Sequence, residues 1–163
     1  MIILGIDPGT ATTGYGLIRK SKTQNIKSQR DFKCLDYGVI LTKPGTPDAD
    51  RLKKLYNELV FIIREHKPDF LAVERLYFFK NAKTVIPVAQ AKGMVLLAAA
   101  KKNIPVFEFT PLQVKMTVVG YGRAEKSQVQ EMIKVMLGLE KIPKPDDAAD
   151  ALGVAICCAN SLR

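Results

Sequence analysis

Four acidic residues of the chain have the positions and spacing of a shared site. Asp7 comes directly after an apolar run and before a Pro-Gly turn, and Glu74 ends a second apolar run. Asp147 and Asp150 lie three residues apart in the predicted first turn of a helix, so their side chains point the same way. Grouped carboxylates repel one another unless protons or cations intervene. Oxygen-only ligands favour Mg²⁺ or Mn²⁺, and two such ions are the usual apparatus for in-line attack by water on a phosphodiester.

Each of these acids also has a purely structural interpretation. Asp7 before Pro-Gly suits a turn, Asp147 suits the start of a helix, and Glu74 could pair with a nearby lysine. A common metal-binding pocket is nevertheless favoured over separate capping roles. Two buried strands both end in acids, and a helix begins with two more.

Composition favours one domain that binds a polyanion. The 163 residues fit a single domain, residues 1–163, and the formal net charge of +9 with a pI near 9.5 suggests nucleic acid as the partner. A basic surface that is merely solvated is the alternative. The first residues lack the basic region of a signal peptide, and no apolar stretch reaches the ~18 residues of a membrane span.

The three cysteines indicate reduced thiols. Cys34, Cys157 and Cys158 are odd in number, two are adjacent, and all lie in apolar surroundings, which is typical of buried thiols in the cytoplasm. A zinc site is not expected, because the one histidine, His66, is not accompanied by cysteines at metal-ligand spacing.

Hydrophobic periodicity predicts an α/β fold: a five-stranded mixed sheet with helices on both faces. Three antiparallel strands come first, and helix-crossed parallel strands follow. We expect Asp48 to cap the first helix, which stops near Pro68. The expected strands are about 2–7, 14–19, 33–41, 70–74 and 105–109, and the remaining helices are about 83–102, 111–118, 125–137 and 147–160.

The motifs of the chain resemble those of the RuvC family of Holliday-junction endonucleases, whose fold is of the ribonuclease H type. The resemblance spans essentially the whole chain, and the order and spacing of its motifs are highly specific. The matching segments are Gly5-Ile-Asp-Pro-Gly-Thr10 with Gly14-Tyr-Gly16, Val73-Glu-Arg-Leu-Tyr-Phe-Phe-Lys-Asn81, Gln113-Val-Lys115, Val118-Val-Gly120, Ala124-Glu-Lys-Ser-Gln-Val129 and Asp147-Ala-Ala-Asp-Ala-Leu152.

The resemblance implies that Asp7, Glu74, Asp147 and Asp150 are the metal-binding catalytic carboxylates. Some members of the family have histidine at the position of Asp147, so this chain has the all-carboxylate version. Asp146 falls outside the family pattern. The implied cofactor is Mg²⁺, for which Mn²⁺ substitutes, with two ions in each subunit.

The resemblance also singles out Lys115 and Lys126 as functional lysines that contact DNA near the cut. A lysine there can neutralise charge that develops in the transition state. Ordinary solvated helix lysines are the alternative interpretation. Ser127 with Gln130 resembles a capping box, so part of this motif can simply start a helix.

An aromatic run after Glu74 is the further candidate for DNA contact. Tyr77 and Phe78, with Lys80 and Asn81, are expected to lie beside the acids, where aromatic rings can stack on exposed bases. Tyr77 is the better stacking candidate, because Phe78 or Phe79 is expected to pack under the next helix.

The activity implied by the resemblance is symmetric, metal-dependent hydrolysis of phosphodiesters in four-way junction DNA during recombination and repair. The products would carry 5′-phosphate and 3′-hydroxyl ends. The family is homodimeric, and the small residues of the helix at about 83–102 offer a surface for close approach of a second helix. The RuvA–RuvB branch-migration complex is the expected protein partner.

Two functions of other classes share some of these features. The Asp-Pro-Gly-Thr sequence at residues 7–10 also resembles the phosphate loop of sugar kinases and actin-like ATPases, although 163 residues are few for the duplicated domain that those folds need. A junction-binding protein without nuclease activity is the other alternative, and the presence of all four carboxylates argues against it.

Overall fold

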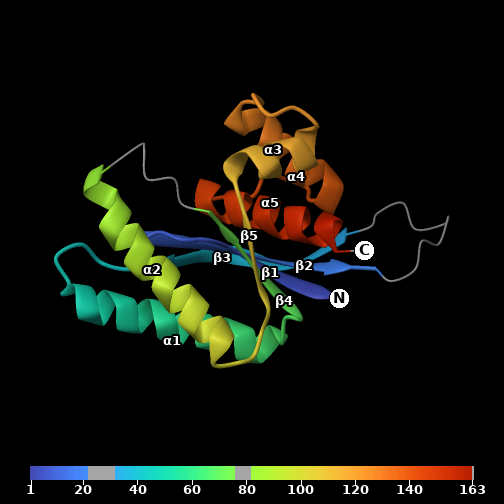
Figure 1. Ribbon diagram of the computed structural model, residues 1–163. Helices are drawn as coiled ribbons and strands as arrows, with labels where there is room; N and C mark the ends of the chain where they lie inside the picture. Colours follow the sequence, from blue (N-terminus) through green and yellow to red (C-terminus); the bar gives the residue numbers. More distant parts are fainter. Residues whose placement is uncertain (22–31, 76–81, 163) are drawn as a thin grey trace.

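The chain forms one mixed β-sheet between two layers of helices (Figure 1). The computed structural model describes residues 1–21, 32–75 and 82–162. The strands are β1 (Ile2–Asp7), β2 (Thr12–Lys20), β3 (Phe32–Leu41), β4 (Phe70–Glu74) and β5 (Val106–Phe109). The helices are α1 (Asp48–His66), α2 (Ala82–Ala100), α3 (Pro111–Val119), α4 (Lys126–Leu137) and α5 (Asp146–Ser161).

The sheet has the strand order β3-β2-β1-β4-β5. Strands β1, β2 and β3 form an antiparallel meander, whereas β4 runs parallel to β1 and β5 runs parallel to β4. Helices α1 and α2 cover one face of the sheet, and α3, α4 and α5 lie on the other (Figure 1). The predicted α/β class and ribonuclease H-like arrangement are therefore confirmed.

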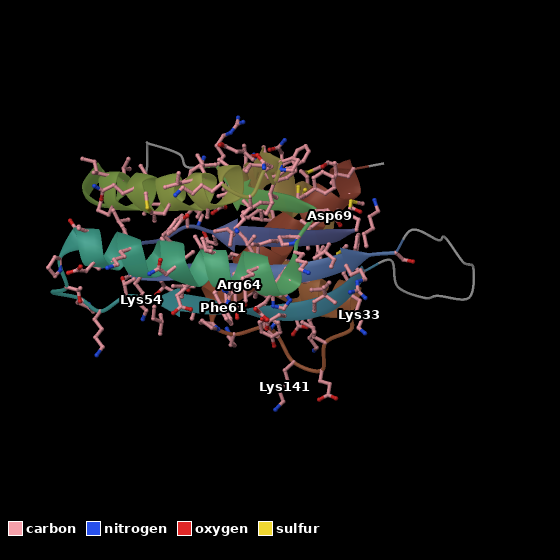
Figure 2. All side chains as sticks on the ribbon, turned by 90° about the horizontal axis from the view of Figure 1, so that it is seen from below. Lys33, Lys54, Phe61, Arg64, Asp69 and Lys141 are labelled. Carbon is pink, nitrogen blue, oxygen red and sulfur yellow. The ribbon has the colours of Figure 1, made fainter. Side chains whose placement is uncertain are left out.

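Strand β1 is the centre of the sheet and is buried on both faces. Its apolar residues divide between two cores: Leu4 and Ile6 contact the α1–α2 layer, and Ile3 contacts the α5 layer. The α1 layer is seen from outside in Figure 2, where Lys54, Phe61 and Arg64 are labelled along the helix. Burial of apolar surface on both faces makes β1 a rigid base for the acid at its end.

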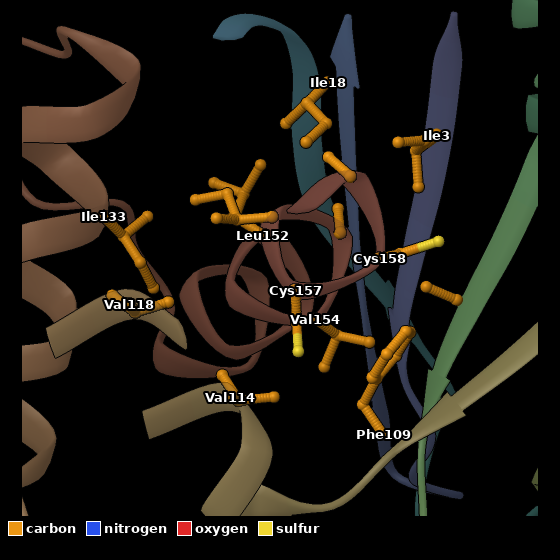
Figure 3. Close-up of a cluster of buried hydrophobic side chains, with 14 of the residues drawn as sticks. Ile3, Ile18, Phe109, Val114, Val118, Ile133, Leu152, Val154, Cys157 and Cys158 are labelled. Atoms are coloured by element: carbon orange, nitrogen blue, oxygen red, sulfur yellow. The ribbon is translucent and has the colours of Figure 1, made fainter. Parts of the chain in front are cut away.

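Helix α5 is the most deeply buried helix, because it lies between the sheet and the α3–α4 pair. Its residues from Ala148 to Ala159 are buried with the exception of Asp150, and Cys157 and Cys158 are among them as free thiols. Val114 of α3 and Ile133 of α4 belong to the same hydrophobic cluster (Figure 3).

Two local predictions about helix starts are wrong. Asp48 does not cap α1: it is the first helical residue, and Pro47 occupies the cap position. The capping box of α4 is two residues earlier than expected, because the backbone N–H of Glu125 donates to Oε1 of Gln128 at 2.9 Å, and Ser127 is already inside the helix. None of the helices in the described part of the chain has the length and continuous apolarity that a membrane crossing requires.

Candidate active site

Asp7 and Glu74 lie side by side at one edge of the sheet. Strands β1 and β4 are parallel neighbours in which Ile6 pairs with Val73, so the next residue of each strand is an acid. Both strands deliver their last residue to the same edge because they run in the same direction. The expected convergence of the two strand-ending carboxylates is therefore found.

Helix α5 brings Asp147 and Asp150 to the same edge. The helix lies directly on β1 and β2 at two glycines, where a Cβ atom at Gly5 would overlap the carbonyl oxygen of Ala151 and one at Gly14 would overlap that of Asp147. Backbone contact of this kind fixes the height of the helix over the sheet. The positive end of the α5 dipole thereby faces the carboxylates.

The turn after Asp7 is held by hydrogen bonds from neighbouring elements. Thr13, which is buried in β2, donates its hydroxyl to the carbonyl oxygen of Gly9 at 2.5 Å. The hydroxyl of Thr42 donates to the carbonyl oxygen of Thr10 and accepts from Nε of Arg51 at 2.9 Å. The Pro8-Gly9 turn is therefore tied to both β2 and α1, which restricts movement of Asp7.

The carboxylates raise one another's pKa values. Burial raises the pKa of Asp7 to about 8, and the charges of Glu74, Asp150 and Asp147 act in the same direction. Burial also raises the pKa values of Glu74 and Asp150, against the lowering effect of Lys126 on both. The hydrogen bond between Asp7 and Glu74 further raises the pKa of Asp7 and acts to lower that of Glu74. The negative charge of the carboxylates is therefore not fully offset by the cations around them.

Lys126 at the start of α4 supplies one positive charge to this cluster. Its Nζ donates to Oδ2 of Asp150 at 2.8 Å and lies 3.6 Å from Oδ2 of Asp146. Burial opposes the charged form, but the hydrogen bond and charge of Asp150 raise the pKa of Lys126. Asp146 is itself bound by Lys144 at 2.7 Å, and its charge acts to raise the pKa of Asp150.

Lys115 reaches the site through a cavity. The cavity has a volume of about 260 Å³ and is lined by Lys115 of α3, Lys126 of α4, and the acids Glu74 and Asp150. Its other walls are apolar residues of α3, α4 and α5: Pro111, Val114, Val129, Ile133 and Val154, with Gly153. Both predicted lysines therefore border the acids, one through a direct ion pair and one across the cavity.

The donor set fits a hard divalent cation better than any other metal. Four carboxylates face one another, and neither cysteine nor histidine is among them, which is the ligand chemistry of Mg²⁺ or Mn²⁺. Within the described residues, no three acidic, histidine or cysteine side chains are oriented to hold one ion as they stand. Asp150 is hydrogen-bonded to Lys126 instead.

The predicted DNA contacts of the aromatic segment lie outside the described residues. Two positions that shape the site were not predicted from the sequence. Tyr77, Phe78, Phe79, Lys80 and Asn81 lie outside the described residues. Thr13 and Gly14 were not predicted to have a role, yet they hold the Asp7 turn and the α5 start. The Gly-Tyr-Gly sequence was the available signal for Gly14, whereas a single threonine in a strand carries none.

Comparisons with known proteins give a consistent assignment. The family model described as Crossover junction endodeoxyribonuclease RuvC matches residues 3–158. A Desulfitobacterium hafniense protein of the same description is 54% identical over 163 residues, which cover 100% of this chain and 94% of the relative. One from Pelotomaculum thermopropionicum is 51% identical over 160 residues, covering 98% and 93%. The structure of Thermus thermophilus RuvC in complex with Holliday junction substrate superposes with a TM-score of 0.88 at 31% identity, covering 98% and 93%.

Proposed function

Because the chain belongs to the RuvC family of crossover junction endodeoxyribonucleases, we propose that it resolves Holliday junctions in DNA recombination and repair. The proposed reaction is structure-selective hydrolysis of one phosphodiester in each of two symmetry-related strands. The observation that carries the proposal is the convergence of Asp7, Glu74, Asp147 and Asp150 at the ends of β1 and β4 and the start of α5.

Asp7, Glu74, Asp147 and Asp150 are the proposed ligands of Mg²⁺, with two ions in each subunit and Mn²⁺ as a substitute. The mutual repulsion of these carboxylates supports a cation here, because a bound cation would offset the repulsion that raises the pKa values of Asp7, Glu74 and Asp150. When bound, Mg²⁺ supplies the charge that favours deprotonation of the attacking water and stabilises the leaving oxygen.

The residues around the acids position the DNA strand for in-line attack. Lys126 and Lys115 hold the phosphate oxygens and offset the negative charge that develops on them. Water forms a new bond to phosphorus as the bond to the 3′ oxygen breaks, which leaves a 5′-phosphate and a 3′-hydroxyl. The acids are held at a fixed position relative to that phosphate by the rigid turn after Asp7 and by the glycine contacts under α5.

A homodimer is the proposed assembly, with α2 at its two-fold axis. Three large apolar residues of α2, namely Ile86, Leu96 and Leu97, are exposed by 69%, 36% and 42%. A Cβ atom at Gly93, between them along the helix, would meet no atom within 4 Å. This stripe lets a second α2 approach closely, and a two-fold axis there gives the paired sites that symmetric cleavage needs.

The proposed protein partner is the RuvA–RuvB branch-migration complex, which follows from membership of the family. The proposed location is the cytoplasm, because Cys34, Cys157 and Cys158 are free thiols, as is usual in a reducing compartment.

Cleavage of synthetic DNA tests this function directly. We expect paired symmetric nicks in a four-way junction when Mg²⁺ is present, none when EDTA replaces it, and little or no cleavage of a linear duplex of the same sequence. Equal cleavage of junction and duplex would overturn junction selectivity. Binding of the junction without cleavage in any divalent metal would favour a non-nucleolytic junction-binding protein.

A further inference from the structure

An exposed apolar patch lies on α3 and on the turn that connects it to α4. Leu112 and Met116 are one helical turn apart and are 58% and 51% exposed, and Tyr121 in the turn is 57% exposed. Gly122 lies against Leu112 so closely that a Cβ atom would overlap the leucine side chain. The turn therefore rests on α3, and Tyr121 extends the apolar surface of the helix instead of standing apart from it.

This patch is continuous with the candidate active site. Lys115 precedes Met116 and is on the same side of α3 as Leu112, since residues three and four apart share a helix face. Lys115 also lines the cavity that holds Glu74, Asp150 and Lys126. A DNA strand that leaves the acids and passes Lys115 would next meet the patch.

The charge of this segment suits a nucleic acid. Between positions 111 and 125 the chain has two cations, Lys115 and Arg123, and one carboxylate, Glu125, which occupies the N-cap of α4. Arg123 is exposed two residues after Tyr121. Aromatic and apolar groups beside cations are the usual surface for unpaired DNA, because bases stack on the rings while the cations hold phosphates.

The exposed aromatic residue of α1 has more acidic surroundings, although Arg64 lies over its ring at 5.6 Å. Phe61 is 53% exposed, but it lines a groove that also contains the carboxylates of Asp36, Glu58 and Glu65 (Figure 2 labels Phe61). Phosphates would be repelled there. Exposure of an aromatic ring is thus common to both faces. The two differ in acidity, because the α3–α4 turn has one carboxylate, Glu125 at the N-cap of α4, whereas the groove at Phe61 has three.

We propose that Leu112, Met116, Tyr121 and Arg123 form a DNA-stacking platform that holds an unpaired nucleotide of the strand next to the cut phosphate. Tyr121 stacks on its base, Leu112 and Met116 support the ring and the sugar, and Arg123 binds the following phosphate. The platform is a substrate-positioning surface, and the inference rests on the proposed function. The platform would give the DNA a second contact beside the one made by the acids and lysines.

Fluorescence of a base analogue tests the stacking. Junctions carry 2-aminopurine at successive positions beside the cut, and the wild type is compared with Tyr121→Phe, Tyr121→Ala and the control Phe61→Ala, with Ca²⁺ replacing Mg²⁺ to slow cleavage. We expect quenching at one position for the wild type, Tyr121→Phe and Phe61→Ala, and its loss in Tyr121→Ala. Cleavage in Mg²⁺ should fall by about tenfold to a hundredfold in Tyr121→Ala alone.

Salt dependence tests the arginine. Arg123→Ala should lower the slope of log binding constant against log salt by about one, whereas Arg64→Ala on α1 should leave it unchanged. The platform is refuted if the wild type nicks the junction and Tyr121→Ala does so at the same rate with the same quenching. A wild type that fails to nick any junction would instead overturn the proposed function itself, so the two failures are distinguishable.

Discussion

Gly14 of β2 lies directly beneath the carbonyl oxygen of Asp147 of α5, with no space between them for a side chain. Gly14 is also the partner of Asp7 across the β1–β2 ladder. One glycine therefore sets the separation between an acid on the sheet and an acid on the helix. Its neighbour Thr13 fixes the turn after Asp7, so positions 13 and 14 together control the geometry of the carboxylates.

In Gly14→Ala we expect a large loss of cleavage and a smaller loss of stability. The added methyl group meets backbone, which must shift, at a cost of about 1–3 kcal/mol in the free energy of unfolding. A displacement of α5 by ~1 Å would reduce cleavage by about a hundredfold. Chemical denaturation and junction cleavage by the folded protein measure the two effects separately.

Gly38→Ala is the matched control for that variant. Gly38 lies in the neighbouring strand β3, and its added methyl group would meet the ring end of Tyr15, at 2.9 Å from the hydroxyl oxygen, which can move aside. We expect nearly normal cleavage. Equal losses in both variants would show that any alanine in this sheet is disruptive and would remove the special role of Gly14.

Removing the charge of Lys126 should change metal binding and cleavage in opposite directions. Lys126 is hydrogen-bonded to Asp150 at 2.8 Å and competes with a cation for that carboxylate. In Lys126→Met we expect tighter Mg²⁺ binding by titration calorimetry and slower cleavage at saturating Mg²⁺. Lys134→Met is the control on the same helix, because Lys134 pairs with Glu131 away from the acids. Unchanged metal affinity in Lys126→Met would contradict the competition.

Metal-free protein should lose stability as the pH rises. The pKa of Asp7 is raised from 3.8 to about 8 by burial and by neighbouring acids, so the folded state binds the proton more tightly than the unfolded state. The free energy of unfolding therefore falls between those two values, and Asp7→Asn should flatten the fall. Denaturation in EDTA at a series of pH values measures this.

Added Mg²⁺ should reverse the trend, since metal binding requires deprotonated carboxylates and becomes more favourable at higher pH. A metal-free protein that gains stability across the same range would show that the acids are stabilised as charged groups, contrary to the raised pKa values.

Charged substitutions on α2 should dissociate the proposed dimer. Leu97→Glu places a carboxylate in the exposed apolar stripe, where burial against a second copy would leave it unpaired. Sedimentation equilibrium is expected to give a dimer for the wild type and a monomer for this variant. Val135→Glu is the control, because Val135 is 64% exposed on α4. A dimer that survives Leu97→Glu would move the interface away from α2.

The sequence predicted most of the fold because the apolar patterns of its elements are strong. The buried run before Asp7 and the shorter run before Glu74 indicated two strands. Their shared direction follows from the two antiparallel strands and the helix that lie between them in the chain. The helix starts were less predictable, because the residues that can take the capping role lie within two positions of each other: Pro47 and Asp48 at α1, and Glu125 and Ser127 at α4.

The acids of the site could be predicted, but the elements that position them could not. Asp147 and Asp150 were placed on one side of a helix by their spacing. That the helix rests on Gly14, and that Asp150 is hydrogen-bonded to Lys126, depends on contacts between segments far apart in the chain. Local patterns contain no information about such contacts.

Separation of binding from cleavage in Asp7→Asn is the most direct test of the metal-dependent acid cluster. Asparagine keeps the size of the side chain but removes the charge that the proposed Mg²⁺ site requires. We predict that the variant binds a four-way junction with nearly the affinity of the wild type in a gel-shift assay and makes no nicks in Mg²⁺. Symmetric nicking by Asp7→Asn at the wild-type rate would contradict the account.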